Sequence, residues 1–400
     1  MRVAIAGGGI GGLVLARALE GYGIDAEVYE QADELREVGA AVALSANGVR
    51  ELERLGIGTE LAEISAAPSS LCVRDQDGTL ISREGMAEDD IYLRSFGAPY
   101  YGVHRVPLLN LLARDVAPAR IYLGHRVVAA EADGSLRFAD GSKASADVVV
   151  GADGVHSAVR QTLPFGGEPR FSGTVGYRGL VERTAVPSLP EPSAIQFWAG
   201  PGAHLLHYPI ADGEIINFLA VARVPEWTAD SWMAPCDPQE SVERFAGWHS
   251  AVQEMVGAVQ ESARWALHDH SVLDRWHIDR TVLIGDAAHA MLPHQGQGAN
   301  QTIEDAVALA EHLASADTAS VPATLASYED QRRDRTARVQ AWSRRTADVL
   351  HLAADDVDRR DAAFDDLPDQ LAWIHGHDAR AAARASIERA AHPPAGRIKR

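Results

Sequence analysis

The chain is poor in the features that mark exported, membrane-bound or nucleic-acid-binding proteins. Only two of its 400 residues are cysteines, Cys72 and Cys236, which excludes a disulfide framework and the spacing of a cysteine metal site. The formal net charge of -19 at pH 7 argues against nucleic acids and anionic membranes as partners. The sequence has no apolar run of membrane-spanning length and no basic start followed by a signal-peptide core. We therefore expect a protein of the reducing cytoplasm.

What is present is the composition of an ordinary globular protein. Hydrophobic residues make up 46% of the chain and charged residues 23%. A chain of 400 residues buries a large core and is long enough for two domains. No internal repeat or low-complexity segment interrupts it, so the functional information lies in local motifs.

The N-terminal segment has the pattern of a dinucleotide-binding turn. The apolar run Val3–Ala6 predicts a strand, and a glycine cluster and a helical pattern follow it. Gly7 permits the tight turn, Gly9 lets a pyrophosphate approach the backbone, and Gly12 lets helix and strand pack closely. Glu30 ends the next predicted strand, where a carboxylate binds a ribose diol. This motif predicts a dinucleotide site, but by itself it leaves NAD and FAD open.

Two further glycine motifs follow apolar strands much later in the chain. Val148–Val150 runs into a Gly-Ala-Asp-Gly turn that contains Asp153, and Thr281–Ile284 runs into Gly-Asp at Asp286. Asp286 thus stands at the C-terminal end of a strand, where open α/β sheets bind ligands. The glycine-marked run 293–300 precedes a helix and offers backbone N–H groups to an anion or a carbonyl. The three motifs predict one site assembled from distant segments.

Together these motifs resemble those of the class A flavoprotein monooxygenases, the single-component FAD-dependent aromatic hydroxylases, and in particular their salicylate hydroxylase-like branch. The string from Gly285 to Ala306 is the most specific part of the resemblance. One departure is Ala46, which stands where a proline usually precedes the asparagine. Other matching stretches extend from the N-terminus to near the C-terminus: Leu35–Ala40, His104-Arg105, Tyr177–Gly179, His207–Pro209 and Ala372–Ile374 beside Asp378.

The resemblance implies a cofactor, two co-substrates and a reaction. FAD would be reduced by NADH or NADPH, and a flavin hydroperoxide formed with O2 would hydroxylate a small phenolic or aromatic acid, an activity of EC class 1.14.13. The cofactor-binding residues that it implies are Gly7, Gly9, Gly12, Glu30, Arg36, Arg105, Asp153, Asp286, Gly296, Gly298, Ala299 and Asn300.

The wide separation of the motifs predicts a discontinuous FAD-binding domain in an α/β fold. This domain would be Rossmann-like, of the glutathione reductase type, with an inserted, mostly antiparallel substrate sheet and C-terminal helices. A strand, an Asp-Gly turn and a second strand within 205–221 support the insertion. We expect a monomer or a homodimer. The expected boundaries are 1–70, 100–175 and 275–350 for the FAD domain, 71–99 and 176–274 for the substrate domain, and 351–400 for the C-terminal helical segment.

Electrophilic oxygen transfer to a phenol is faster after deprotonation, so a base is expected near the substrate hydroxyl. His207 is the first candidate, because it lies on a strand of the predicted substrate sheet. His294 is the second, because it lies with Pro293 on the loop expected to face the flavin. Each also has a plain interpretation as a hydrogen-bonded structural histidine. Arg178 and Tyr208 are candidates for contact with the substrate, and no metal site is expected.

Other functions are compatible with parts of this pattern. The same flavin motifs serve epoxidases and tailoring monooxygenases that act on larger natural products. A flavin-binding protein without turnover and an NAD-dependent dehydrogenase are further alternatives. The identity of the substrate, the position hydroxylated, any accompanying decarboxylation and the choice of NADH or NADPH are left open by the sequence.

Overall fold

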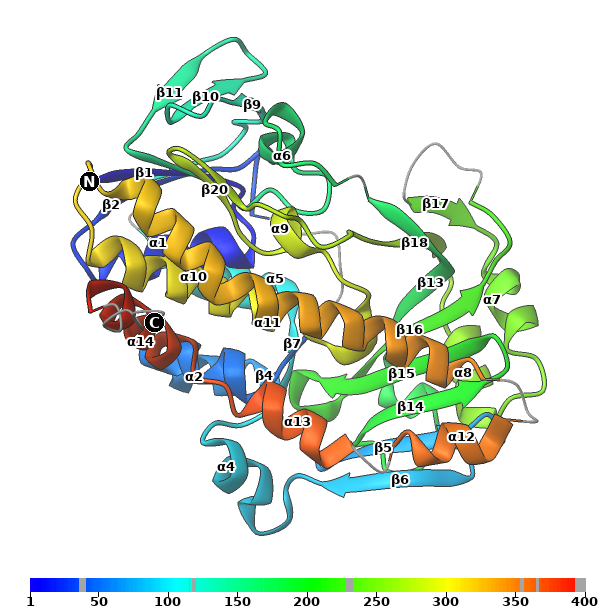
Figure 1. Cartoon of the computed structure of the whole chain (residues 1–400). Helices are drawn as coiled ribbons and strands as arrows, with labels where there is room; N and C mark the ends of the chain where they lie inside the picture. Colours follow the sequence, from blue (N-terminus) through cyan, green and yellow to red (C-terminus); the bar gives the residue numbers. More distant parts are fainter. Residues whose placement is uncertain are drawn as a thin grey trace, which may run out of the picture.

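A computed structural model describes residues 1–35, 41–114, 116, 120–167, 169–227, 233–352, 356–364 and 367–392. It has two large sheets set side by side, with one long helix running along both (Figure 1). Among these residues, no helix is both long enough and apolar enough to cross a membrane.

The first sheet is the one that carries the glycine motifs. Four of its five strand pairings are parallel, and the edge strand β19 pairs antiparallel with β20. Strand β12 is fully buried, and β1 is buried except at Arg2, because helices cover the sheet, as parallel sheets require. Its strands, in spatial order, are β19 (His277–Ile278), β20 (Thr281–Leu283), β12 (Val148–Gly151), β1 (Arg2–Ala6), β2 (Asp25–Tyr29) and β8 (Ile121–Tyr122).

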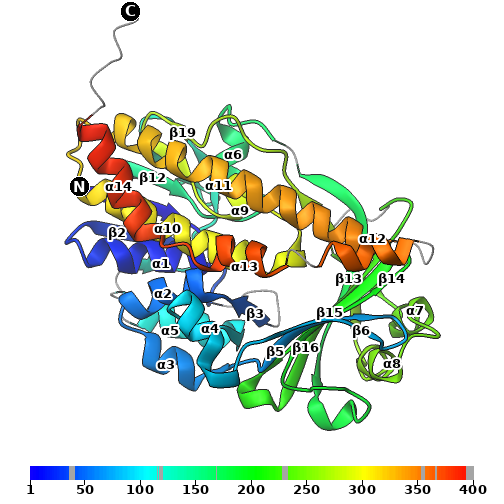
Figure 2. The ribbon, with the colours of Figure 1, turned by 60° about the horizontal axis from the view of Figure 1, so that its bottom comes forward.

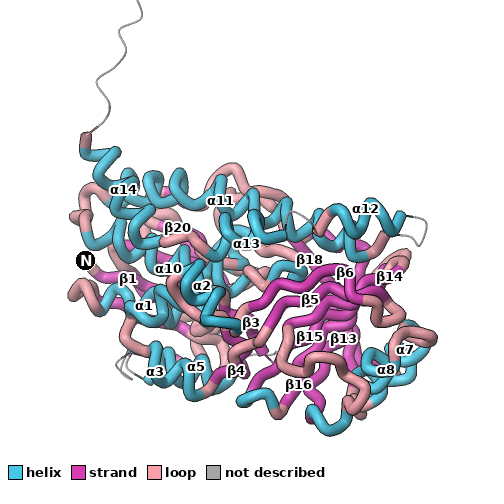
Figure 3. The backbone as a smooth tube through the Cα atoms, turned by 90° about the horizontal axis from the view of Figure 1, so that it is seen from below, coloured by secondary structure: helices cyan, strands magenta, loops and turns pink. Residues whose placement is uncertain are grey.

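The second sheet has eight strands and is antiparallel except where β14 pairs with β5. Helices α7 and α8 pack on its outer face around a separate apolar cluster that includes Phe245 and Trp248 (Figure 3). Its strands, in spatial order, are β17 (Met233–Cys236), β18 (Ser262–Asp269), β13 (Arg170–Glu182), β16 (Ile215–Arg223), β15 (Ala203–Ile210), β14 (Ile195–Gly200), β5 (Ser70–Asp75) and β6 (Leu80–Gly85).

Two small sheets complete the strand inventory of the described residues. One is a meander and the other lies near the junction of the two large sheets. They consist of β9 (Val127–Ala130), β10 (Ser135–Phe138) and β11 (Lys143–Ser145), and of β3 (Ala41–Leu44), β7 (Tyr101–His104) and β4 (Ser65–Ala66).

Helices cover the parallel sheet and extend from it toward the antiparallel one. Helix α10 packs on α1, and the C-terminal helices α12, α13 and α14 lie beside α10 and α11 (Figure 2). The helices are α1 (Ile10–Glu20), α2 (Ala46–Arg54), α3 (Gly58–Glu63), α4 (Ile91–Phe96), α5 (Arg105–Arg114), α6 (Ala158–Thr162), α7 (Pro238–Arg244), α8 (Ser250–Gly257), α9 (Asp286–His289), α10 (Gly298–Ala314), α11 (Val321–Leu350), α12 (Val357–Ala362), α13 (Leu367–His375) and α14 (Ala379–Ala391).

The predicted fold class is confirmed, including the parallel sheet, the antiparallel substrate sheet and the C-terminal helices. The strand–turn–strand pattern forms β15 and β16, joined by a short turn at Ala211–Gly213. The domain boundaries stay a prediction. Strands β5 and β6 lie in the antiparallel sheet, whereas β13 continues without a break through the boundary expected at residue 175.

Candidate functional site

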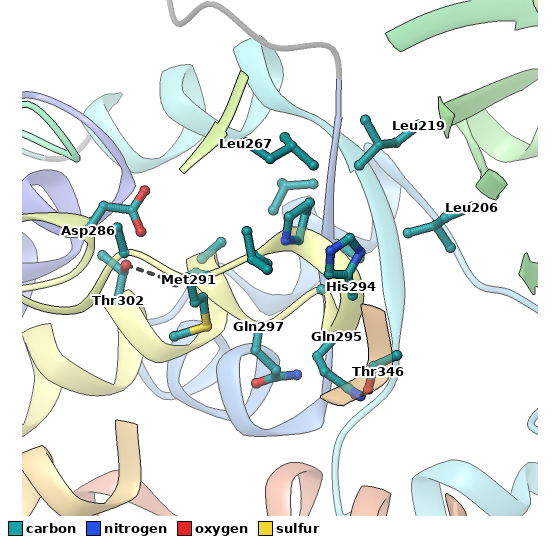
Figure 4. A pocket seen from close by; sticks show the side chains of 18 of the residues that line it. Leu206, Leu219, Leu267, Asp286, Met291, His294, Gln295, Gln297, Thr302 and Thr346 are labelled. Carbon is teal, nitrogen blue, oxygen red and sulfur yellow. Dashed lines mark hydrogen bonds between the residues drawn. The ribbon is translucent and has the colours of Figure 1, made fainter. Parts of the chain in front are cut away.

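A cavity of about 470 Å³ lies between the two large sheets and is lined by residues of both. The glycine motifs supply one end, including Gly9, Gly154 and Asp286. Strands β15, β16 and β18 supply the other end, with Leu206, Leu219 and Leu267 (Figure 4). A concave, mostly apolar site with a few polar groups is typical of a small-molecule binding site.

The first glycine motif makes a turn that no other residue type fits. Gly7 has a φ of +110°, and a Cβ there would lie 2.4 Å from the Ala152 carbonyl oxygen. A Cβ on Gly12 would lie 2.0 Å from the Gly7 carbonyl oxygen. These two glycines therefore serve close packing, whereas Gly9 lines the cavity at the start of α1. No side chain caps this helix start, so its first N–H groups are open to an anion.

Glu30 lies directly beside this turn. Its carboxylate accepts a hydrogen bond from the backbone N–H of Gly8 at 2.7 Å and another from that of Ala32 at 2.9 Å. The carboxylate is thereby fixed at the end of β2, where a ribose would lie, although Glu30 is not among the residues that line the cavity. Arg36, the neighbouring candidate, lies outside the described residues.

Asp153 shapes a loop and does not line the cavity. It accepts hydrogen bonds from the Ser157 hydroxyl at 2.5 Å and the Val159 N–H at 3.2 Å. Ser157 in turn caps α6 by accepting from the Arg160 N–H. The loop that is held in this way presents Gly154 and His156 to the cavity.

The side chain of Asp286 is accessible from the cavity. The protein that surrounds the cavity keeps bulk water away from the carboxyl group, and this desolvation raises its pKa. The turn before it is braced from behind by Asp305. That carboxylate accepts from the Gly285 N–H at 2.8 Å and is 2.5 Å from Nε2 of His289. Burial by itself would raise the pKa of Asp305, but His289 and Arg332 hold it below its usual value.

The run before α10 divides into residues that line the cavity and one residue that holds the run in place. Gly296, Gly298 and Ala299 line the cavity. A Cβ on Gly298 would meet no atom within 4 Å, which leaves open space at this helix start. Asn300 lies behind the run, where it donates to the carbonyls of Ala43 at 3.0 Å and Gly296 at 2.8 Å. From this position, Asn300 supports the loop.

A buried charge network continues from Asp305 into α11. Arg332 lies 2.6 Å from Glu304 and 2.7 Å from Asp305, and all three side chains are fully buried. Arg335 lies 2.7 Å from Glu304, which also accepts a hydrogen bond from Asn47 at 2.7 Å. Burial would raise the pKa of Glu304, but Arg335 and Arg332 hold it far below its usual range. The network is therefore charged and fastens the cavity-lining loops to α2, α10 and α11.

The other end of the cavity is an apolar clamp. Leu206, Leu219, Leu267 and Leu292 line it, together with Pro293 and His294 (Figure 4). The loop that carries His294 is held against α11, since the Ser343 hydroxyl donates to the Leu292 carbonyl and Gln295 donates to Thr346.

The placement of His207 does not support its choice as the base. Neighbouring residues of a strand point to opposite faces, and Leu206 and Tyr208 line the cavity. His207 therefore points to the other face of the sheet, where its ring stacks on Trp198 and makes no hydrogen bond within the described residues. Burial lowers the pKa of its imidazole to about 3.

His294 lines the cavity and belongs to a cluster of three histidines. Its Nδ1 is 3.2 Å from Nε2 of His204, whose Nδ1 is 2.6 Å from Nε2 of His351. Burial lowers the pKa of His294 to about 3 and of His351 to about 4, and it lowers that of His204 as well. The three rings are therefore neutral at pH 7.

Arg178 and Tyr208 both line the cavity. The Arg178 guanidinium lies 4.8 Å from the centre of the Trp265 ring, a cation–π contact that fixes its direction. Burial and the neighbouring Arg105 lower the pKa of Arg178. Arg105 also lines the cavity, so this part of the wall carries two basic side chains.

Several cavity residues were not found from the sequence. Leu206 follows from strand alternation once Tyr208 is assigned to the cavity, because the two residues share one face of β15. His204 lies on the same face but is not among the residues that line the cavity. No local signal places His351 beside His204, since 147 positions separate them. The same holds for the C-terminal residues that close one side of the cavity, Phe364, Leu367, Leu371 and His375.

Known proteins resemble this chain over nearly its whole length. A family model described as an FAD binding domain matches residues 1–343. A 3-amino-4-hydroxybenzoate 2-monooxygenase of Streptomyces platensis is 40% identical over 385 residues, which cover 94% of this chain and 96% of the relative. A salicylate hydroxylase of Pseudomonas putida is 34% identical over 407 residues, covering 94% and 93%. A solved salicylate hydroxylase–substrate complex superimposes with a TM-score of 0.84 at 32% identity, covering 96% of this chain and 98% of that structure.

Proposed function

Because this chain belongs to the FAD-dependent aromatic monooxygenases, we propose that it hydroxylates a small benzoate that carries a phenolic hydroxyl group. An aminohydroxybenzoate is the first candidate substrate, since that is the substrate named for the relative with 40% identity. Salicylate, named for a relative with 34% identity, is the second.

The observation that carries this proposal is the composition of one cavity. The loops that fit a flavin dinucleotide and the leucine clamp with His294 share the same space, so a ring held by the clamp lies next to the cofactor site. The end lined by the glycine motifs fits FAD by three features. Helix α1 begins without a side-chain cap, Gly298 borders open space, and no described residue donates a hydrogen bond to the exposed carboxylate of Asp286.

The candidate cofactor residues divide by position into two groups. We assign Gly9 and the start of α1 to the pyrophosphate, Glu30 to a ribose and Asp286 to the hydroxyls of the ribityl chain. Arg105 lies on the same wall and suits the phosphates. The residues assigned to the flavin ring by their place on the cavity wall are Gly296, Gly298 and Ala299, whereas Gly7, Gly12, Asp153 and Asn300 support the loops.

FAD, when bound and reduced by NADH or NADPH, supplies the activation of O2. The chain's own residues hold the substrate ring, exclude water and accept the proton of the phenolic hydroxyl group. The leucines hold the ring by its faces, and the neutral imidazole of His294 lies on the wall of the same cavity. Arg178 is the proposed partner of the substrate carboxylate, because its guanidinium lies on the cavity wall and the Trp265 ring fixes its direction.

The test is substrate-stimulated oxidation of NADH and of NADPH by the FAD-loaded protein. The panel contains 3-amino-4-hydroxybenzoate, salicylate and 3-hydroxybenzoate, with benzoate as a control that lacks the hydroxyl group. We expect at least one hydroxybenzoate to accelerate oxidation and to yield a product heavier by one oxygen atom, with benzoate inactive. If no member of the panel is hydroxylated, the proposal fails and a larger natural-product substrate becomes the better assignment.

A further inference from the structure

A buried amide faces the cavity without a hydrogen-bond partner. Asn217 of β16 lines the cavity, and only 8% of the residue is exposed. Within the described ranges, no residue is hydrogen-bonded to its carboxamide group. A buried carboxamide is costly unless a bound molecule completes its hydrogen bonding, so this side chain points to a ligand in the cavity.

The residue opposite Asn217 in the sheet has the same property. In the antiparallel pairing of β15 and β16, Tyr208 lies directly opposite Asn217. Tyr208 also lines the cavity, is 6% exposed, and has no hydrogen-bond partner for its hydroxyl group among the described residues. Burial raises the pKa of this hydroxyl group, so it is neutral and can both donate and accept. The Cβ atoms of directly opposed residues are about 4.5–5.5 Å apart, which brings the two groups to one part of the wall.

These two residues lie beside a basic side chain of the same wall. One step along the strands, Leu206 lies opposite Leu219, which in turn lies opposite Arg178 on β13. Residues two positions apart on a strand share a face, so Asn217 is a diagonal neighbour of Arg178. The charge of Arg178 also acts on the hydroxyl group of Tyr208 and lowers its pKa. Asn217, Tyr208 and Arg178 therefore form a polar corner next to the leucines at the right of Figure 4.

This polar corner offers more hydrogen bonding than a simple hydroxybenzoate uses. In the proposed function, Arg178 binds the carboxylate and the hydroxyl group lies by His294, which leaves Asn217 and Tyr208 without a role. A ring that bears only these two substituents would bury both side chains without partners. A third polar substituent on the ring removes this cost.

We propose that Asn217 selects substrates that carry an amino group beside the phenolic hydroxyl group, with Tyr208 as the second contact of that amino group. This inference rests on the proposed function, because it assigns one more substituent to the same ring. In it, both side chains touch the substrate.

The chemistry of the pair favours an amino group over other substituents. An aromatic amino group has two N–H donors and is a poor acceptor, because its lone pair is delocalised into the ring. The carbonyl oxygen of Asn217 and the hydroxyl oxygen of Tyr208 supply one acceptor for each N–H. The N–H groups of Asn217 then serve the oxygen of the hydroxyl group on the neighbouring ring carbon. Among the described residues, Asp286 is the only carboxylate that lines the cavity, so the amino group is bound in its neutral form.

The test compares substituents of equal size on the wild-type protein. The oxidised, FAD-loaded protein is titrated with 3-amino-4-hydroxybenzoate, 4-hydroxy-3-methylbenzoate and 3,4-dihydroxybenzoate, and the change in flavin absorbance gives each dissociation constant. A methyl group fills the space of the amino group but forms no hydrogen bond. We expect the amino compound to bind about 10- to 100-fold more tightly than the methyl compound. This measurement requires neither a variant nor turnover.

Two variants and a control assign this preference to the polar corner. Asn217→Leu replaces the carboxamide by an apolar group of similar size, so the preference for the amino compound over the methyl compound should fall to about threefold or less. Tyr208→Phe removes one acceptor and should reduce the preference by a smaller factor. Leu180→Ala is the matched control: Leu180 lies opposite Asn217 on β13 but does not line the cavity, and the ratio of the two dissociation constants should stay at the wild-type value.

Equal affinity of the wild type for the amino and methyl compounds overturns the inference, as does an Asn217→Leu variant that keeps the wild-type ratio. Tighter binding of 3,4-dihydroxybenzoate than of the amino compound overturns the assignment of an amino group. Hydroxylation separates these outcomes from failure of the proposed function. A wild type that hydroxylates a hydroxybenzoate without preferring the amino compound lacks only this selectivity, whereas a wild type that hydroxylates none contradicts the proposed function itself.

Discussion

The cavity lies between two buried polar regions that are built on opposite principles. On the flavin side, Glu304 and Asp305 are paired with Arg332 and Arg335, and the groups are held in their charged forms. On the substrate side, the side chains of three histidines are hydrogen-bonded only to one another within the described residues, and burial keeps them neutral. Both regions are almost inaccessible to solvent.

The difference shows what each kind of burial can do. A charged network has one favourable protonation state, so it fixes the geometry of the Gly-Asp turn and of the loop that Asn300 holds. A neutral imidazole has two tautomers, so each ring nitrogen can either donate or accept a hydrogen bond. The first region holds the cofactor loops in place, and the second suits chemistry at the substrate.

The largest effect is expected from breaking the charged network. Arg332→Met should lower the free energy of unfolding by about 3–5 kcal/mol, because Glu304 and Asp305 lose a shared buried partner. Chemical denaturation of the apo and FAD-loaded proteins measures this loss, and absorbance of the purified protein reports flavin content. Arg333→Met is the control, since Arg333 is one third exposed and its partners within the described residues are Glu329 and a backbone carbonyl. Equal stability of the two variants would contradict a structural role for the network.

An intermediate effect is expected when the cavity-facing histidine is replaced. His294→Gln should reduce hydroxylation by about 100-fold, while the protein still binds FAD and oxidises NAD(P)H with release of hydrogen peroxide. His207→Gln should leave the ratio of product to NAD(P)H unchanged, because His207 faces away from the cavity. The measurement is product formed per NAD(P)H consumed. An equal loss of product per NAD(P)H in both variants would show that the face of the strand on which a histidine lies does not identify the base.

The smallest effect concerns the pH dependence of the free energy of unfolding. It sharpens the contrast between groups that are buried in their charged form and histidines that are buried in their neutral form. Burial lowers the pKa of His207 to about 3, so below pH 6.5 the unfolded chain binds a proton at this residue that the folded protein does not. Above pH 6.5, His207 contributes nothing to the pH dependence of unfolding. As the pH drops from 6.5 toward the pKa of His207 in the folded protein, the free energy of unfolding falls. His207→Leu should therefore flatten the pH dependence of unfolding between pH 6.5 and 4 by about one proton. Urea titrations at three pH values test this, with the exposed His392→Leu as control; an unchanged slope in His207→Leu would refute it.

Much of the fold was predictable because its signals are local. Glycines such as Gly7 and Gly12 are required by contacts within a strand–turn–helix unit, and apolar runs such as Val148–Val150 mark buried parallel strands. The family, the FAD cofactor and the enzyme class inferred from these motifs are confirmed. Exact boundaries were less accessible: strand β13 runs without a break through residue 175, where a domain boundary was expected.

The site was predictable where chain neighbours decide it and unpredictable where tertiary contacts do. Adjacent residues His207 and Tyr208 were both proposed for the site, yet a strand can turn only one of them to a given face. The contact between His204 and His351 depends on where α11 ends relative to β15, which no local pattern encodes. The assignments of Gly9, Glu30, Arg105 and Asp286 to FAD stay predictions.

The 30-residue helix α11 has a further mechanical consequence. At about 1.5 Å per residue it is a rod of about 45 Å, in which Arg332 of the first half pairs with Glu304 and His351 follows the C-terminal end. Because the helix is continuous, a rotation about its axis turns both halves by the same angle. The orientations of the charged network and of the histidine cluster about this axis are therefore linked. A single alanine inserted after Thr336 would turn the second half by about 100°, disengaging Ser343 from the Leu292 carbonyl while leaving the Arg332 pairing in register. Natural variation in the length of this helix should therefore be confined to its ends.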